Sequence, residues 1–227
     1  MTNDDMSHAA LELWKYTEGP LHVLWKRPEL SPRDRSIITI AALIARNHTI
    51  ELPYHINLAL DNGIHPREVS EIITHLAFYS GRENALAAIV IAQNVFNSHH
   101  TTKGKTIEPV MHLAIDETAE AKRAENVKQR FGNVAPGLLQ FTTDILFRDL
   151  WLRSDLTTRD RSLVTVSALI AGGHVAQMPF HVNKAMDSGL TRTQLGEVIT
   201  HLAFYVGWPN AFSGMSAVKE ILEQRHH

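Results

Sequence analysis

The sequence contains no cysteine. This absence excludes disulfide bonds, thiolate metal ligands and every reaction that needs a cysteine nucleophile or a redox-active thiol pair. Histidine, by contrast, occurs 14 times, and its unperturbed pKa lies close to neutral pH. Chemistry in this chain must therefore use groups other than thiols.

The sequence also lacks clusters of basic residues and long runs of apolar residues. The net charge is -2, and Lys and Arg do not cluster as they do in proteins that neutralise nucleic-acid phosphates. No apolar stretch approaches the roughly 20 residues that cross a bilayer, and residues 1–5 are acidic where a signal peptide is basic. We expect a cytoplasmic protein with no nucleic-acid partner and no membrane partner.

An internal repeat organises the chain. The stretch ELPYHINLALDNG at residues 51–63 recurs as QMPFHVNKAMDSG at residues 177–189, and 177 minus 51 gives an offset of 126. A repeat this long indicates a duplicated unit. We therefore predict two similar halves of about 100 residues each, one at 1–100 and one at 119–227, joined by a polar linker at 101–118.

Capping patterns and apolar spacing predict helices in both halves. Ser31 and Pro32 are typical of a helix start, and the apolar run at 37–44 predicts that this helix is buried. The β-branched content of that run is compatible with a strand, but its length and capping favour a helix. Further helices are expected over 51–62, 66–80 and 84–97, with equivalents in the second half. The predicted fold class is all-α.

Two segments outside the repeated helices have their own patterns. Residues 8–27 mix apolar and polar side chains, and Gly19 and Pro20 predict a break in this short helical lead-in. Residues 119–130 are rich in Lys, Arg and Glu and predict an exposed helix that ends at Gly132.

One constellation could carry acid–base chemistry. His48, Glu51 and His55 stand at positions i, i+3 and i+7, which share a face when they are helical. A carboxylate at Glu51 would orient the His55 imidazole for proton transfer. Arg35, near the start of the preceding helix, is suited to hold a substrate carboxylate. We predict catalytic roles for His55, Glu51 and Arg35.

Two other interpretations of these residues stay open. Histidines on helices are often structural, and the apolar neighbours of His75 and His201 are typical of packing, while Arg35 beside Asp34 is compatible with a helix-end salt bridge. Two histidines and a glutamate also suit zinc. Gln177 is a poor metal ligand, however, and we predict no metal.

The repeated stretch resembles the signature of the carboxymuconolactone decarboxylase family. EIITHLAFY at 71–79 and GWPNA at 207–211 strengthen the resemblance, which covers roughly residues 30–97 and 156–223. It implies an all-α, alkylhydroperoxidase-like unit, present here as a tandem duplication with two pseudo-symmetric halves. Single-unit members commonly form hexamers, so three tandem chains would close an equivalent ring, and we expect a homotrimer.

The resemblance also implies an activity. Thiol-using relatives carry Cys-x-x-Cys-x-x-x-His, and His48 and Glu51 occupy the two cysteine positions here, which excludes their disulfide-based peroxidase chemistry. The decarboxylase branch removes carbon dioxide from a small carboxylated lactone without a cofactor. Such a reaction needs an apolar cavity, anchors for the substrate oxygens and an acid that protonates the enolate.

The resemblance completes the set of candidate residues. His181 matches the family histidine of the second half and is the fourth predicted catalytic residue. Because Gln177 replaces Glu51, we expect unequal halves, the first carrying the catalytic carboxylate and the second providing wall and scaffold. The predicted substrate-binding residues are His48, Tyr54, His75, Arg161, His174 and His201.

Two alternative functions remain at this point. One is another lyase, an isomerase or a hydrolase that acts on a small carbonyl compound, since one fold hosts many reactions. The other is a non-catalytic ligand-binding or assembly module in which the repeated histidines are structural.

Overall fold

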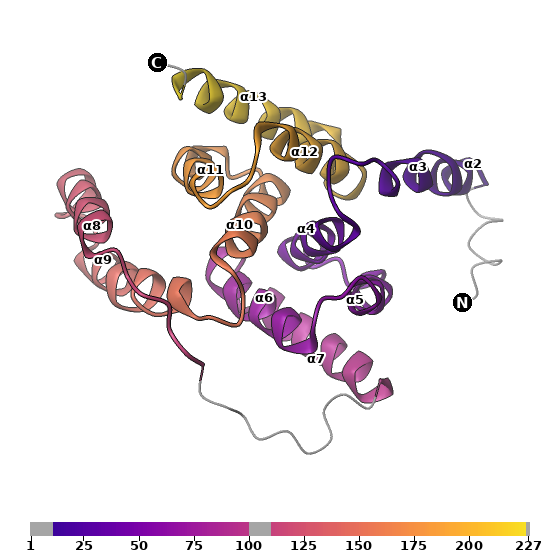
Figure 1. The fold of residues 1–227 in the computed structure, drawn as a ribbon, viewed down its shortest axis with the longest axis horizontal. Coiled ribbons are helices and arrows are strands. Elements are labelled where there is room, and N and C mark those ends of the chain that lie inside the picture. The colour runs from indigo at the N-terminus through magenta and orange to yellow at the C-terminus, as the bar shows by residue number, and fades with distance from the viewer. Residues whose placement is uncertain (1–10, 100–109, 226–227) are drawn as a thin grey trace.

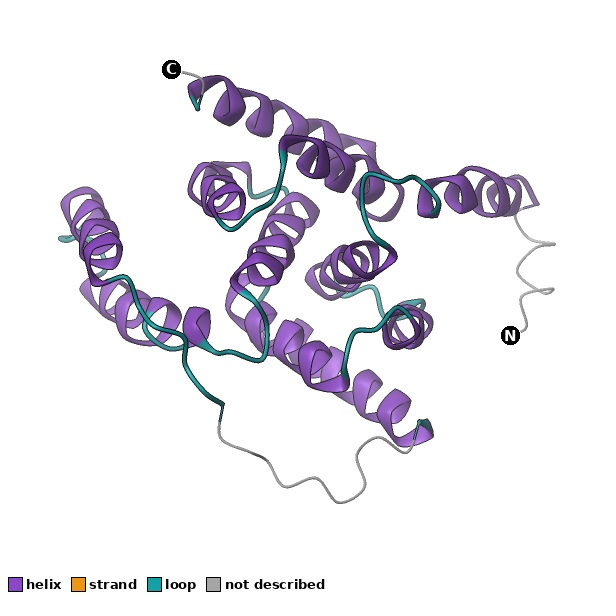
Figure 2. Ribbon diagram, viewed as in Figure 1, coloured by secondary structure: helices purple, strands orange, loops and turns teal. Residues whose placement is uncertain are grey.

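The computed structural model describes residues 11–99 and 110–225, and the predicted fold class is confirmed. Every regular element in these ranges is helical, apart from one isolated antiparallel bridge between His112 and Arg153. Figure 2 shows this helical architecture. No helix in the described part of the chain is long and apolar enough to cross a membrane.

Each half contains four equivalent helices. The first half has α4 (Pro32–Ala45), α5 (Leu52–Asp61), α6 (Pro66–Tyr79) and α7 (Arg82–Ser98), and the second has α10 (Thr158–Gly172), α11 (Met178–Asp187), α12 (Arg192–Val206) and α13 (Trp208–Gln224). In Figure 1, α4 and α10 lie side by side at the centre, between the α6–α7 pair and the α12–α13 pair.

The helix starts follow the predicted caps. The Ser31 hydroxyl accepts a hydrogen bond from the Asp34 amide at 3.0 Å, and Thr157 does the same for Asp160 at 3.1 Å. Gly81 and Gly207 separate consecutive helices with φ angles of 92° and 86°. These left-handed values favour glycine, because a Cβ atom would be strained there.

The lead-in differs from its prediction. Instead of breaking at Gly19 and Pro20, it continues through α2 (Leu11–Tyr16), the π-helical turn η1 (Thr17–Leu21) and α3 (His22–Trp25). Proline has no amide hydrogen and clashes with the carbonyl one α-helical turn earlier. The wider π-turn places Pro20 without ending the helix.

The structure describes the predicted linker at 101–118 only from residue 110, and the earlier linker residues lie outside the described ranges. Residues 110–116 are not helical, and α8 (Glu117–Phe131) follows them, close to its predicted bounds. The chain then passes through α9 (Pro136–Phe141), η2 (Thr142–Phe147), η3 (Leu150–Leu152) and, after α10, η4 (Val175–Gln177).

One apolar core joins the two halves. The central helices are almost fully buried, and residues such as Ile37, Ile40, Leu163 and Val166 are completely covered. The same cluster of buried residues includes side chains from both repeats. The halves therefore share their interior, which places side chains of one repeat beside the histidines of the other.

Candidate functional site

Two reciprocal buried networks connect the halves. Arg35 of α4 donates to Glu197 of α12 at 2.8 Å, and its other terminal nitrogen lies 3.1 Å from His201 Nδ1. His201 Nε2 lies 2.8 Å from the Thr39 hydroxyl. The equivalent network joins α10 to α6, and its residues are Arg161, Glu71, His75 and Thr165.

These networks correct four of the expected site residues. Arg35, Arg161, His75 and His201 are each 0% exposed, and their charged or ring atoms bond to protein groups. Each arginine also pairs with the histidine of the other repeat, whereas the sequence suggested partners within one half. We therefore assign them to holding the halves together rather than to binding a substrate.

The buried ion pair at Arg35 has a large expected effect on stability. Glu197→Ala should lower the free energy of unfolding by about 3–5 kcal/mol, because it leaves the Arg35 guanidinium buried without its counter-charge. Urea unfolding followed by circular dichroism measures this loss. Glu83→Ala is the control, since the Arg82–Glu83 pair is exposed. Equal unfolding midpoints for both variants would contradict the assigned role.

His55 lies on α5 in an aromatic enclosure. Its ring is 5% exposed, stacks on Trp25 at a centroid distance of 6.0 Å and meets Tyr205 edge-on at 5.4 Å. Tyr54 gives a second edge contact at 5.1 Å. No hydrogen bond reaches Nδ1 within the described residues. Burial lowers the pKa of His55 to about 4, so the ring is neutral at pH 7.

The predicted partnership between Glu51 and His55 is loose. Glu51 is the N-cap residue of α5, its side chain is 64% exposed, and its carboxylate lies 3.9 Å from His55 Nε2. That separation exceeds a hydrogen bond, so Glu51 does not orient the imidazole as expected. His48 precedes α5 and is exposed.

His181 repeats this enclosure in the second half. It stacks on Trp151 at 5.9 Å and meets Tyr79 edge-on at 5.2 Å, and its Nδ1 atom lacks a hydrogen bond within the part of the chain described. Burial, followed by the nearby charge of Lys184, lowers the pKa of His181 to about 4. Tyr79 belongs to the first repeat, just as Tyr205 beside His55 belongs to the second.

A cavity of about 210 Å³ lies beside His181. Its lining comes from both repeats and comprises Phe78, Tyr79, Leu169, His174, Gln177 and His181. His174 and Gln177 are exposed at its edge, while Tyr79 and His181 lie deeper. The cavity combines an apolar wall with a neutral imidazole, and it lies in the half that the sequence assigned to scaffolding.

Some of these site residues were missed from the sequence. Trp25 and Trp151 occupy equivalent repeat positions, as do Tyr79 and Tyr205, and each tryptophan donates a hydrogen bond to a tyrosine of the other half at 2.9 or 2.8 Å. Their conservation between the repeats was a usable signal. The missing information was that α3 and η3 fold over the opposite repeat.

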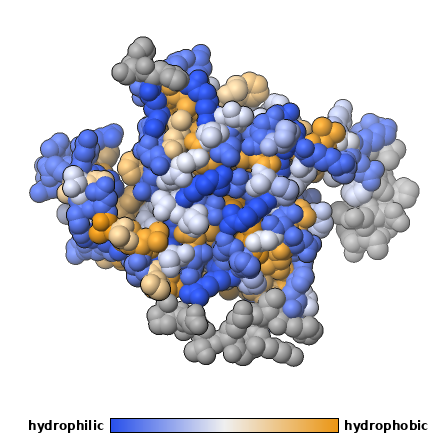
Figure 3. All heavy atoms as spheres, in the orientation of Figure 1, coloured by the Kyte–Doolittle hydropathy of each residue, from blue (hydrophilic) through white to orange (hydrophobic). Residues whose placement is uncertain are grey.

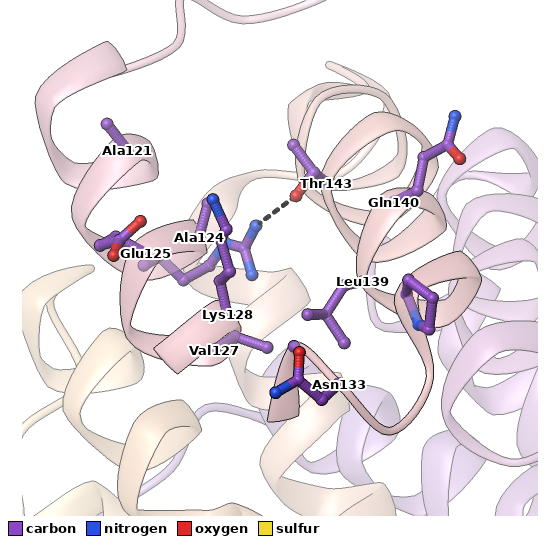
Figure 4. Close-up of a pocket in the computed structure, with 12 residues that line it drawn as sticks. Ala121, Ala124, Glu125, Val127, Lys128, Asn133, Leu139, Gln140 and Thr143 are labelled. Atoms are coloured by element: carbon purple, nitrogen blue, oxygen red, sulfur yellow. Dashed lines mark hydrogen bonds between the residues drawn. The ribbon is translucent and has the colours of Figure 1, made fainter. Parts of the chain in front are cut away.

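A larger cavity, of about 500 Å³, lies between α8 and the α9–η2 segment. Figure 4 shows Lys128, Asn133, Gln140 and Thr143 around it, with a hydrogen bond drawn to Thr143. The donor is Arg123, whose charge is already paired with Glu120 at 2.6 Å. This cavity contains none of the predicted site residues.

The described residues contain no group of three or more histidine, aspartate or glutamate side chains arranged to hold a metal ion. His48 therefore does not form such a cluster with His55, and His174 does not form one with His181. Each of the two enclosures is built from aromatic rings around a single imidazole.

Comparison with known proteins agrees with this architecture. A family model described as the carboxymuconolactone decarboxylase family matches residues 13–94 and 136–220. A nitrosuccinic acid decarboxylase of Metarhizium robertsii is 31% identical over 81 residues, covering 36% of this chain and 57% of the relative. A 4-carboxymuconolactone decarboxylase of Acinetobacter baylyi is 37% identical over 73 residues, covering 32% of this chain and 54% of the relative.

These two alignments extend over little more than half the length of each relative. The family model, by contrast, matches two regions that include both aromatic enclosures and most of the chain. The two matched regions correspond to the two repeats, with α8 between them. The chain therefore belongs to the carboxymuconolactone decarboxylase family.

Proposed function

We propose that the protein is a lyase that decarboxylates a small carboxylated lactone or a related carbonyl compound. The observation that carries this proposal is the cavity beside His181, where a buried, neutral imidazole meets an apolar wall. Membership of the family and the names of two relatives support the reaction class.

The apolar wall acts on the reacting carboxylate. Phe78, Tyr79 and Leu169 replace part of its hydration shell, and poor solvation disfavours the localised carboxylate relative to a transition state with dispersed charge. When the bond between the carboxylate carbon and its neighbour breaks, carbon dioxide leaves and the electron pair remains on the substrate as an enolate. The carbonyl group of the substrate accepts that charge.

His181 supplies the proton that completes the reaction. Burial alone keeps the ring neutral, but an anion beside it favours the imidazolium form and raises its pKa. The imidazolium then protonates the enolate carbon and returns to the neutral form. The net change is uptake of one proton and release of one carbon dioxide, so we propose that no cofactor takes part.

A substrate panel tests the proposed function. Carboxylated unsaturated lactones, β-keto acids and a nitro-substituted dicarboxylic acid are incubated with the purified protein, and released carbon dioxide is measured against a heat-denatured control. Enzyme-dependent release from at least one compound is expected. A panel without any release, from protein whose folding is verified by circular dichroism, would count against a decarboxylase.

We also propose a homotrimer. Apolar side chains lie exposed at helical spacing on α7 and α13, namely Leu86, Ile89, Val90, Phe212 and Met215. Figure 3 shows apolar patches separated by hydrophilic surface on one face of the molecule. Exposed apolar stripes of this kind are typical of surfaces that pack against a partner.

Light scattering after size exclusion tests the assembly. The expected mass is about three times that of the 25.5 kDa chain. Ile89→Glu should reduce the mass, because it places a charge in the apolar stripe of α7, while leaving the helical content unchanged. A wild-type mass equal to one chain would contradict the trimer.

A further inference from the structure

The two histidine enclosures have the same shape-determining residues but different charges. We call them the His55 site (Trp25, His55, Tyr205 and the adjoining Glu51) and the His181 site (Trp151, His181, Tyr79 and the adjoining Gln177). Glu51 and Gln177 are equivalent in the repeat. One enclosure therefore carries an acidic group at its edge, where the other carries a neutral amide.

A second difference between the two sites also makes the His181 site more positive than the His55 site. Lys184 lies one helical turn after His181, and its repeat equivalent after His55 is Leu58. The Lys184 ammonium group lies 4.7 Å from the centre of the Trp151 ring. Within the described ranges it forms no hydrogen bond or ion pair. The His181 site therefore has a neighbouring cation that the His55 site lacks.

The charges of Lys184 and Glu51 act on side chains inside the two enclosures. Lys184 contributes to the lowered pKa of His181, after burial. Glu51 contributes to the raised pKa of Tyr205, again after burial. A carboxylate entering the His55 site would meet the like charge of Glu51. One entering the His181 site would meet the neutral amide of Gln177 in the lining and the positive charge of Lys184, which acts on His181 from outside the lining.

Other acidic groups near Lys184 do not cancel this difference. Asp187 is exposed and pairs with Arg225 at 2.8 Å, and Glu120 pairs with Arg123 at 2.6 Å. Both carboxylates are therefore already matched by a guanidinium, and Lys184 has no ion-pair partner among the residues that the structure describes. The cavity lining itself contains no acidic residue.

From this asymmetry we infer that the His181 site accepts small carboxylate anions and that the His55 site rejects them, with Gln177 and Lys184 as the residues that set the difference. The Gln177 amide can donate to a carboxylate oxygen, which a glutamate at that position cannot do. Phe78 and Tyr79 cover the apolar part of the ligand. The inference rests on the proposed function only in taking the anion as the substrate class.

The repeat supplies the matched variants for a test. Gln177→Glu with Lys184→Leu gives the His181 site the residues of its counterpart, and Glu51→Gln with Leu58→Lys does the reverse. Each new side chain already occupies the equivalent position in the other half, so the fold should tolerate it. Circular dichroism and the imidazole signals of the buried His75 and His201 report whether the core is intact.

Benzoate is the probe, and benzamide is its uncharged control of the same shape. The protein is labelled with ¹⁵N in its histidine rings, and the signals of His55 and His181 are assigned with His55→Gln and His181→Gln. In the wild type, benzoate should shift His181 and leave His55 unchanged, while benzamide should shift neither to a comparable extent. The double change at Gln177 and Lys184 should weaken benzoate binding about tenfold or more.

The exchange of all four residues gives the decisive result. His55 should then respond to benzoate and His181 should not. Equal responses in the wild type, or a response that stays at His181 after the exchange, would overturn the inference. Because binding is measured without turnover, a substrate panel with no carbon dioxide release would remove the proposed reaction and leave the anion site standing. Carbon dioxide release by a wild type in which His55 and His181 respond equally to benzoate would do the opposite.

Discussion

Replacing His181 with alanine is expected to lower kcat/KM for decarboxylation by about 10²- to 10⁴-fold, the range typical of losing a general acid. The ring is the titratable group that lies deepest in the cavity lining, and its Nδ1 atom has no protein partner within the described residues. The loss should fall mainly on kcat, because the aromatic wall still binds the substrate. Initial rates of carbon dioxide release measure it.

His55→Ala is the matched control. The two rings share their burial, stacking and lowered pKa, so any general damage from removing such a ring should be equal. We expect the His55 variant to retain most of its activity. If His55→Ala lost activity while His181→Ala kept it, the chemistry would belong to the first repeat, as the presence of Glu51 first suggested.

Stability should fall as the pH drops from 7.5 to 5, by about 2 kcal/mol for each of His55 and His181, hence about 4 kcal/mol together. Their folded pKa of about 4 lies below the ordinary value of 6.5. The unfolded chain therefore binds more protons than the folded chain through this window. The contribution of the two neutral histidines to the free energy of unfolding is present in full above pH 6.5 and is lost progressively as the pH falls below 6.5. His75 and His201, whose pKa values burial also lowers, act in the same direction.

Urea unfolding at fixed protein concentration, repeated at several pH values, measures this loss. The double variant His55→Gln and His181→Gln should keep only the part of the slope that comes from the other histidines. Protonation of the buried Glu197 carboxylate does not contribute to the loss of stability between pH 7.5 and 5. Burial acts to raise the pKa of Glu197, but hydrogen bonds from Arg27 and Arg35 outweigh it and hold the pKa below its usual value. Its stabilising contribution is thus lost only below about pH 4.3. A flat stability between pH 7.5 and 5 would contradict the buried, neutral state of the rings.

Local patterns predicted most of the fold. The Ser31 and Thr157 caps, the apolar run at 37–44 and the offset of the repeat each correspond to a helix or a pair of equivalent helices. These features depend on neighbouring residues, so the sequence contains them directly. The continuation of the lead-in past Pro20 was missed, because Gly19 and Pro20 predicted a break and a π-helical turn was not considered.

The candidate site was less predictable, because its partners come from distant parts of the chain. His55 and His181 were predicted as catalytic residues from their place in the repeat, and in the structure both rings are buried with an Nδ1 atom that has no hydrogen bond within the described residues. Arg35 was misread, since only the packed structure shows that Glu197 covers it. The spacing of Glu51 and His55 suggested an ion pair, but the N-cap position turns the carboxylate towards solvent.

Each repeat contributes a tyrosine to the pocket of the other repeat, and this has a consequence for how such a chain can evolve. Tyr79 is encoded in the first repeat but serves the second pocket, and Tyr205 does the reverse. A substitution at Tyr79 or Tyr205 therefore alters the pocket of the other repeat. We therefore expect that specialisation of either pocket requires matched changes in both segments of the gene.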